Sequence, residues 1–216
     1  MEAGTEALGL RERKKLKTRQ AIADAAMRLF LERGFDNVSI SEIARATDVS
    51  DKTVFNYFPT KEDLFYSRFE TFEAALLEAI RARPRSESYV AAFRRFLQEQ
   101  RGLLAKQDAE AQEQLGRLTR TITSSRPLLV REEQILAGYT RSLAALIAEE
   151  TGAREDDVQP RVVATALIGA HRVLIDYTRR RVLAGDDHKR IARGVRAQTD
   201  KALSVLEEGL AGFGAT

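Results

Sequence analysis

From residue 22 onward, apolar side chains return every three or four positions, the spacing that places them on one face of an α-helix. The members of this stripe are Ile22, Ala25, Ala26, Leu29 and Phe30. Gly34 is predicted to end the helix, because glycine readily adopts the left-handed conformation that closes many helices.

Two shorter helices are predicted next. Ser39 is followed by Glu42 three residues later, the pairing of a capping box, and this helix ends near Thr47. Ser50 is predicted to cap a third helix over residues 51–57. Two helices joined by a turn of three or four residues have the geometry of a helix-turn-helix, here placed within residues 18–60.

A fourth helix follows Pro59, which cannot continue the third. Thr60 and Asp63 predict its start, and a single connecting helix is expected over residues 61–83, ended by Pro84. Its apolar stripe consists of Leu64, Phe65, Phe69, Phe72, Leu76 and Ile80.

The third helix combines a small apolar face with a polar one. Val54 and Phe58 lie four residues apart and are predicted to point into the core, with Phe55 at the boundary. The outward side chains are polar: Asp51, Lys52, Thr53, Asn56 and Tyr57. Such a helix is too short and too polar outward for a core element, and it suits insertion into a DNA major groove.

On this interpretation, Lys52 and Asn56 reach base edges. Phosphate contacts are expected from Thr53, Tyr57 and Lys61, the last of which lies where free helix N–H groups attract an anion. The alternative is a helical hairpin of a scaffold protein without a DNA role, since helix-turn-helix shapes occur without DNA.

Basic residues crowd the stretch before the first stripe. Six of them stand against Glu12: Arg11, Arg13, Lys14, Lys15, Lys17 and Arg19. Basic side chains oppose the dipole at a helix N-terminus, so the cluster indicates an extension over residues 1–17 that binds a polyanion. A solvated, frayed helix start is the other interpretation.

Composition narrows the function classes. The net charge is only +3, and the chain has no cysteine and two histidines, His171 and His188, so neither a disulfide nor a metal site is expected. No cofactor motif, nucleophile motif or glycine-rich phosphate loop is present, which argues against an enzyme. No apolar run approaches the roughly 18 residues of a membrane span, and no signal peptide is recognised, so a soluble cytoplasmic protein is expected.

The segment AIADAAMRLFLERGFDNVSISEIARATDVSDKTVFNYFPTKEDLF closely resembles the N-terminal DNA-binding domain of the TetR/AcrR family of bacterial transcriptional regulators. The resemblance rests on the spaced motifs A..LF.E.GF, S..EIA...DVS and T.F.YFP.KE.L, and covers Thr18 to about Phe72. It implies an all-α fold of about nine helices. The family's homodimers place their third helices in adjacent major grooves of a pseudo-palindromic operator.

The resemblance also implies roles for residues. Ile40 and Ser41 approach DNA, and Lys61 binds phosphate. The recognition helix supplies Asp51, Lys52, Thr53, Phe55, Asn56 and Tyr57. The basic extension supplies Arg13, Lys14, Lys15, Lys17 and Arg19. Phe55 stands where the family often has Tyr, and Asp51 either accepts from a cytosine amino group or favours the helix dipole.

Residues 84–216 carry no specific motif and are predicted to be helical, and in the family this region binds an effector and dimerises. The last two helices, 158–183 and 187–210, are expected to pair with those of a second copy. The predicted interface stripes are Val163, Leu167, Ala170, Leu174 and Tyr177, and Ile191, Val195, Ala202, Val205 and Leu206. Small residues that would allow close approach are Gly169, Ala170, Gly194 and Ala197.

The effector is expected to be small and hydrophobic or of acyl type. Its pocket candidates are Phe93, Phe96, Arg120, Thr123, Tyr139, Leu146, His171 and Asp176. His171 also fits a hydrogen-bonded position at the dimer seam, and Tyr139 fits the core. The run 179–181 of three arginines is a solvated helix end or a site for an anionic group.

These observations predict a repressor that an effector releases from a double-stranded DNA operator. The alternatives are an activator of the same fold, a non-DNA helical scaffold and an all-α enzyme.

Overall fold

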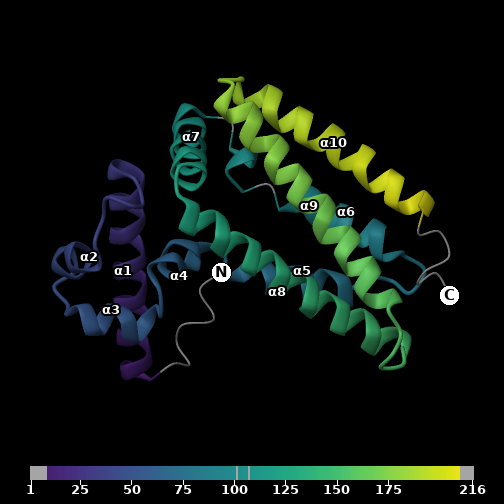
Figure 1. Ribbon diagram of the computed structural model, residues 1–216, viewed down its shortest axis with the longest axis horizontal. Coiled ribbons are helices and arrows are strands. Elements are labelled where there is room, and N and C mark those ends of the chain that lie inside the picture. The colour runs from purple at the N-terminus through teal and green to yellow at the C-terminus, as the bar shows by residue number, and fades with distance from the viewer. Residues whose placement is uncertain (1–8, 101, 107, 210–216) are drawn as a thin grey trace. The chain divides into compact units, whose positions relative to one another are not determined.

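The computed structural model describes residues 9–100, 102–106 and 108–209. The ends of the predicted extension and of the predicted C-terminal domain, residues 1–8 and 210–216, lie outside the described residues. Within the described ranges the chain is all-α, as predicted, without a strand (Figure 1). The elements are α1 (Leu10–Arg33), α2 (Ile40–Ala46), α3 (Asp51–Tyr57), α4 (Lys61–Tyr66), η1 (Ser67–Phe69), α5 (Thr71–Arg81), α6 (Tyr89–Glu99), η2 (Gly102–Ala105), α7 (Ala109–Thr123), α8 (Arg126–Thr151), α9 (Gln159–Leu183) and α10 (His188–Gly209).

The chain divides into two compact units. The N-terminal unit contains the chain up to Glu70 together with Thr121–Arg131. The C-terminal unit contains Thr71–Arg120 and the chain from Glu132 onward. The described part of the predicted extension, residues 10–17, forms the first turns of α1 rather than a segment apart from it.

An aromatic core holds the N-terminal unit together. The ring centroids of Phe30 and Phe35 lie 5.0 Å apart, and the Phe65 ring lies 5.9 Å from each of them. All three side chains are buried. Because large rings contribute most of the apolar area that a small unit can bury, this cluster stabilises the packing of α1 and α4.

The prediction of a single helix over residues 61–83 is wrong, because the structure divides this segment into α4, η1 and α5. The Ser67 hydroxyl donates a 2.8 Å hydrogen bond to the Leu64 carbonyl at the point where α4 tightens into the 3-10 turn. Phe69, which was predicted to continue the apolar stripe, is 39% exposed. The break accounts for a tenth α-helix in the described residues, where about nine were expected.

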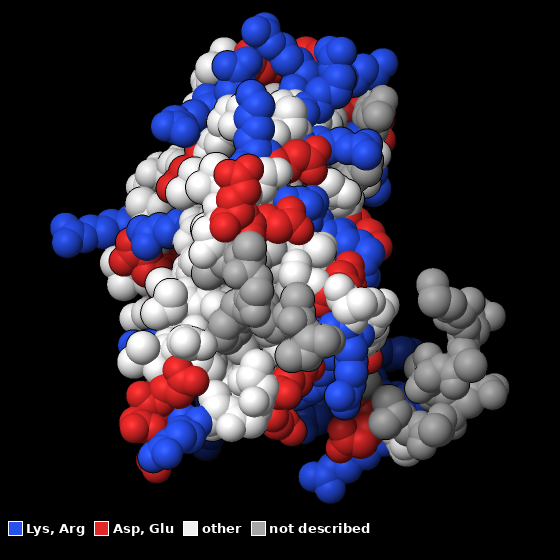
Figure 2. Space-filling model, turned by 90° about the vertical axis from the view of Figure 1, so that its right-hand side faces the viewer, with Lys and Arg blue, Asp and Glu red and all other residues white. Residues whose placement is uncertain are grey.

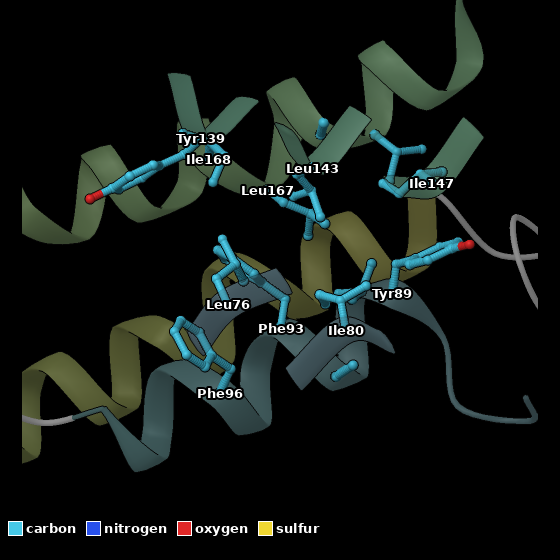
Figure 3. Packing of buried hydrophobic residues seen from close by; sticks show 14 of the residues in the cluster. Leu76, Ile80, Tyr89, Phe93, Phe96, Tyr139, Leu143, Ile147, Leu167 and Ile168 are labelled. Atoms are coloured by element: carbon cyan, nitrogen blue, oxygen red, sulfur yellow. The ribbon is translucent and has the colours of Figure 1, made fainter. Parts of the chain in front are cut away.

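The C-terminal unit is built around one hydrophobic cluster. Its buried side chains come from α5, α6, α8, α9 and α10, and Figure 3 shows them interleaved between facing helices. Helix α10 lies along both α9 and α6 (Figure 1). The shared cluster therefore stabilises the packing of five helices at once.

A polar contact closes one end of this unit. The Arg83 guanidinium lies 3.9 Å from the centroid of the Tyr89 ring and donates to Glu150 at 2.5 Å. The Tyr89 hydroxyl donates to the same carboxylate at 3.0 Å. The contact joins the chain after α5 to the start of α6 and the end of α8, and pairing offsets the cost of burying the charges.

The predicted dimer stripes differ from the structure. Val163, Leu167 and Ile191 are buried in the core of their own chain, so they are not available to a second copy. Gly194, predicted to allow close approach between copies, instead faces Tyr177 of the same chain. The stripes are wrong for these residues because a helical spacing reveals an apolar face but not what covers it.

Substitution of Gly194 tests the α9–α10 packing. A Cβ at residue 194 would lie 2.5 Å from the Tyr177 hydroxyl oxygen, so one of the two must move. We expect Gly194→Ala to lower the free energy of unfolding by about 1 kcal/mol, the overpacking cost exceeding the gain in helix propensity. In a Tyr177→Phe background the nearest ring atom is 3.5 Å away, and the same substitution should stabilise. Urea unfolding followed by circular dichroism measures both, and equal effects in the two backgrounds would contradict the packing.

Candidate nucleic-acid interface

Side-chain caps fix the start of each short helix in the N-terminal unit. The Ser39 hydroxyl accepts from the Glu42 N–H at 3.3 Å, and the Glu42 carboxylate accepts from the Ser39 N–H at 2.8 Å, which confirms the predicted capping box. The Ser39 hydrogen bonds and the nearby Arg33 hold the pKa of Glu42 at about 2. Ser50 caps α3 in the predicted manner, through a 3.1 Å hydrogen bond from the Thr53 N–H.

The turn between α2 and α3 has a feature that sequence reasoning missed. Asp48 has a φ of +52°, in the left-handed region that glycine usually occupies. The Val49 N–H donates to the Ala44 carbonyl at 3.0 Å and the Asp48 N–H donates to the Arg45 carbonyl at 3.4 Å. This is the Schellman arrangement, which lets the chain reverse within four residues and start α3.

The faces of α3 are divided as predicted. Val54 and Phe58 are buried, and Phe55 at the boundary is 48% exposed. Among the polar residues of the helix, Asp51, Lys52 and Asn56 are exposed, whereas Thr53 and Tyr57 are half-buried. The N-terminal end of α3 therefore presents polar side chains outward, as entry of a helix N-terminus into a major groove requires.

Ser41 and Asp51, both predicted to contact DNA, contact each other. The Ser41 hydroxyl donates to the Asp51 carboxylate at 2.5 Å and so joins α2 to the first turn of α3. The carboxylate also lies where the helix dipole favours negative charge. Ile40, the other predicted contact on α2, is half-buried at the start of that helix.

Lys61 is bound within its own unit. Its ammonium group donates to the Phe35 carbonyl at 2.6 Å and lies 4.2 Å from the centroid of the Phe35 ring. Burial lowers the pKa of Lys61, and nearby carboxylates, Asp36 first, partly offset this. The predicted phosphate contact of Lys61 stays a prediction, and an ammonium group retains two further donors for it.

The basic residues in the first part of α1, up to Arg19, fall into two groups. Arg19 donates to both carboxylate oxygens of Glu70 at 2.6 Å, and its guanidinium lies 4.7 Å from the centroid of the Phe58 ring. Arg19 therefore ties α1 to the residue that ends α3. The others are exposed and have no ion-pair partner in the part of the chain that the structure describes: Arg11, Arg13, Lys14, Lys15 and Lys17.

The distant segment Thr121–Arg131 completes the N-terminal unit. The Tyr66 hydroxyl donates to the buried Leu128 carbonyl at 3.1 Å, and Ser125 donates to Asp36 at 2.8 Å. Arg131 forms a 2.6 Å ion pair with Asp63, which also belongs to the capping box of α4. Sequence reasoning missed this docking, and no local pattern signals a contact between residues so far apart.

Comparison with known proteins identifies this arrangement. Residues 22–67 match the family model described as bacterial regulatory proteins, tetR family. The chain is 29% identical over 175 residues to the HTH-type transcriptional regulator TcmR of Streptomyces glaucescens. The aligned region covers 77% of this chain and 75% of that protein. Residues 22–67 form a DNA-binding domain of the TetR family of bacterial regulators. The protein is accordingly a DNA-binding transcriptional regulator, and the helix-turn-helix is its DNA-binding element.

Solved structures of other proteins share the fold of this chain. NalD of Pseudomonas aeruginosa, the secondary repressor of the MexAB-OprM multidrug efflux pump, superposes with a TM-score of 0.54 at 21% identity, over 88% of this chain and 97% of that chain. FadR of Bacillus subtilis in complex with stearoyl-CoA superposes with a TM-score of 0.52 at 22% identity, over 88% and 98%. No helix among the described residues is both long and apolar enough to cross a membrane.

In the C-terminal unit of the regulator, the structure brings together part of the predicted effector site. The rings of Phe93, Phe96, Tyr139 and His171 gather beside Phe72, which sequence reasoning assigned to the connecting helix and not to the pocket. Leu146 belongs to the same buried cluster. The remaining candidates are less enclosed: Thr123 is half-buried, and Arg120 and Asp176 are exposed.

Two of the three arginines at residues 179–181 have partners. Arg179 donates to Glu132 and Arg181 contacts Asp186, whereas Arg180 is exposed. Figure 2 shows Lys and Arg side chains gathered at the upper end of its face, the end at which α9 leads into α10 in Figure 1. Paired as they are, Arg179 and Arg181 are poor candidates for an anionic ligand.

Matched substitutions of two lysines separate folding from DNA contact. Lys52 and Lys61 both lie in the first turn of a short helix, so removal of either charge changes the dipole interaction alike. We expect Lys61→Met to lower the free energy of unfolding by about 1 kcal/mol, because the Phe35 carbonyl loses the ammonium group that donates a hydrogen bond to it. Lys52→Met should leave stability unchanged and weaken DNA binding. Urea unfolding and gel shifts measure the two effects, and equal stability of both variants would contradict a structural role for Lys61.

Proposed function

We propose that the protein is a repressor that binds a pseudo-palindromic operator as a homodimer and is released by a small effector bound in its C-terminal unit. The observation that carries the proposal is the outward polar face of α3, held by the Ser50 cap and by the burial of Val54 and Phe58. In this proposal Lys52 and Asn56 read base edges. Thr53, Tyr57 and the exposed basic residues of α1 contact phosphates.

The basic part of α1 acts as a helical extension in this proposal. The exposed charges at Arg13, Lys14, Lys15 and Lys17 lie on a regular helix, so they would follow the phosphate backbone rather than enter a minor groove as an extended arm. Each phosphate that they neutralise adds to the salt dependence of binding. Arg19 contributes by holding α1 against the end of α3.

The homodimer would use the faces of α9 and α10 that the chain leaves uncovered. On α9, Val162 is 55% exposed and Val173 is 59% exposed, with Gly169 between them; on α10, Val205 is 69% exposed. Exposed large apolar residues in line along two neighbouring helices favour an interface over solvent contact. This stripe keeps Val205 and Gly169 from the predicted interface and replaces its buried members, such as Val163 and Leu167, with Val162 and Val173.

The operator test uses one double variant and one control. The purified protein is titrated against DNA that flanks its own gene, at several salt concentrations. We expect Lys52→Ala combined with Asn56→Ala to weaken binding by at least about 30-fold, because each of the two base contacts contributes about 1–3 kcal/mol. Lys189→Ala removes an exposed charge from the C-terminal unit and should change nothing. Equal binding by the double variant would overturn the assignment of α3, and a reporter gene distinguishes repression from activation.

The dimer test uses Gly169, beside which a Cβ would meet no atom within 4 Å in its own chain. Gly169→Leu should therefore fold, and gain up to about 1 kcal/mol of helix propensity. In a dimer that packs α9 closely it should shift the protein to monomers and weaken operator binding. Ala137→Leu, on the exposed side of α8, is the control. Sedimentation velocity measures the fraction of dimer in each variant. If Gly169→Leu dimerises as strongly as the parent protein, the interface lies elsewhere.

A further inference from the structure

An aromatic cluster in the C-terminal unit has more polar character than a core requires. Phe72 stacks on His171 with centroids 5.0 Å apart and planes 12° apart, and it stacks on Tyr139 at 5.4 Å and 27°. Phe96 meets Phe72 edge-on at 5.1 Å. These rings come from α5, α6, α8 and α9, so four helices meet at this point.

Two groups in this cluster lack hydrogen-bond partners. Among the described residues, neither the Tyr139 hydroxyl nor an imidazole nitrogen of His171 has a partner. Figure 3 shows Tyr139 at one edge of the labelled side chains, with its hydroxyl directed away from the aliphatic ones. Neither group is among the fully buried polar atoms that lack a partner in the described residues, so both can be reached by water or by a ligand.

The cluster is also reachable. Phe93 and Phe96 are buried, whereas Phe72 and His171 are only half-buried. Part of the stacked pair is therefore accessible, while the rings behind it form a closed apolar wall. A flat molecule could contact the accessible rings and reach the unpaired polar groups without displacing the buried core.

The electrostatic surroundings limit what can bind. Burial lowers the pKa of His171 to about 4, so the imidazole is neutral near pH 7. Burial also raises the pKa of Tyr139 to about 12, with smaller contributions from the carboxylates of Glu73 and Glu132. The charged groups that act on Tyr139 are therefore carboxylates, and Arg179 already pairs with one of them, Glu132.

From this geometry we infer that the effector is an uncharged, planar aromatic compound carrying a hydroxyl or carbonyl group, which stacks on Phe72 or His171 and hydrogen-bonds to His171 or Tyr139. The inference rests on the proposed function and replaces the wider expectation of a hydrophobic or acyl-type effector. An acyl-CoA fits poorly, because the carboxylates of Glu73 and Glu132 near Tyr139 would repel its phosphates.

Three probes with the same ring system test the chemistry: 2-naphthol, naphthalene and 2-naphthoate, with palmitoyl-CoA as the acyl comparison. The chain has no tryptophan, so naphthol fluorescence can be followed directly. We expect 2-naphthol to bind at least about tenfold more tightly than 2-naphthoate, because a carboxylate must shed its hydration and is repelled by the nearby carboxylates of Glu73 and Glu132. Palmitoyl-CoA should show no binding.

Two substitutions test the named residues. His171→Phe and Tyr139→Phe keep the ring and remove the polar atoms, so each that contacts the ligand should weaken 2-naphthol binding by about five- to tenfold. Naphthalene affinity should not change, which separates a lost hydrogen bond from a damaged fold. Tyr177→Phe, on the same helix as His171 but facing α10, is the control.

The outcomes separate this inference from the proposed function, because operator binding is measured on the same samples without ligand. Tighter binding of 2-naphthoate or palmitoyl-CoA, no binding of 2-naphthol, or full 2-naphthol affinity in the His171→Phe/Tyr139→Phe double variant would each overturn the ligand assignment and leave the DNA-binding role standing. Binding of 2-naphthol by a protein that does not bind its operator would overturn the proposed function alone.

Discussion

The helix that we assign to the major groove has only seven residues, and its orientation depends on how it is anchored. Helices shorter than about 12 residues are marginal in water, so α3 must draw its stability from its neighbours. Val54 and Phe58 are buried beneath it, Ser50 caps it, and Arg19 covers the Phe58 ring. The small core therefore fixes the orientation of the DNA-binding surface. A substitution that loosens the packing of Phe58 would also turn the exposed side chains of α3 away from the DNA.

Local signals allowed much of the N-terminal unit to be predicted. The capping box of Ser39 and Glu42 is recognisable from four consecutive residues. Pro59 ends a helix because its ring fixes the backbone and removes the N–H group. The outward and inward faces of α3 follow from the spacing of Val54 and Phe58. Asp48 escaped prediction because aspartate rarely adopts a positive φ, and only the reversal between α2 and α3 imposes it.

The features that the sequence did not reveal are contacts between distant segments. Nothing near Tyr66 indicates that its hydroxyl meets the carbonyl of Leu128, 62 residues later. A helical stripe likewise cannot tell whether its apolar face meets the same chain or a second copy, which is why Val163 and Leu167 were misassigned. The helical spacing presents Phe72 as one more apolar residue of a connecting helix, and only the break at η1 and the stacked rings around it mark it as the centre of the aromatic cluster.

Helix α8 supplies residues to both compact units. Its first residues, through Arg131, belong to the N-terminal unit, where the Leu128 carbonyl accepts from Tyr66; the rest belongs to the C-terminal unit, where Tyr139 faces Phe72. Leu128 and Tyr139 are about three turns apart on this helix. A ligand shifts a conformational equilibrium only as far as it prefers one state. A compound that contacts Tyr139, as we propose for the effector, would therefore act on the helix whose first turn supplies Leu128 to the N-terminal unit, as far as it prefers one conformation of that helix.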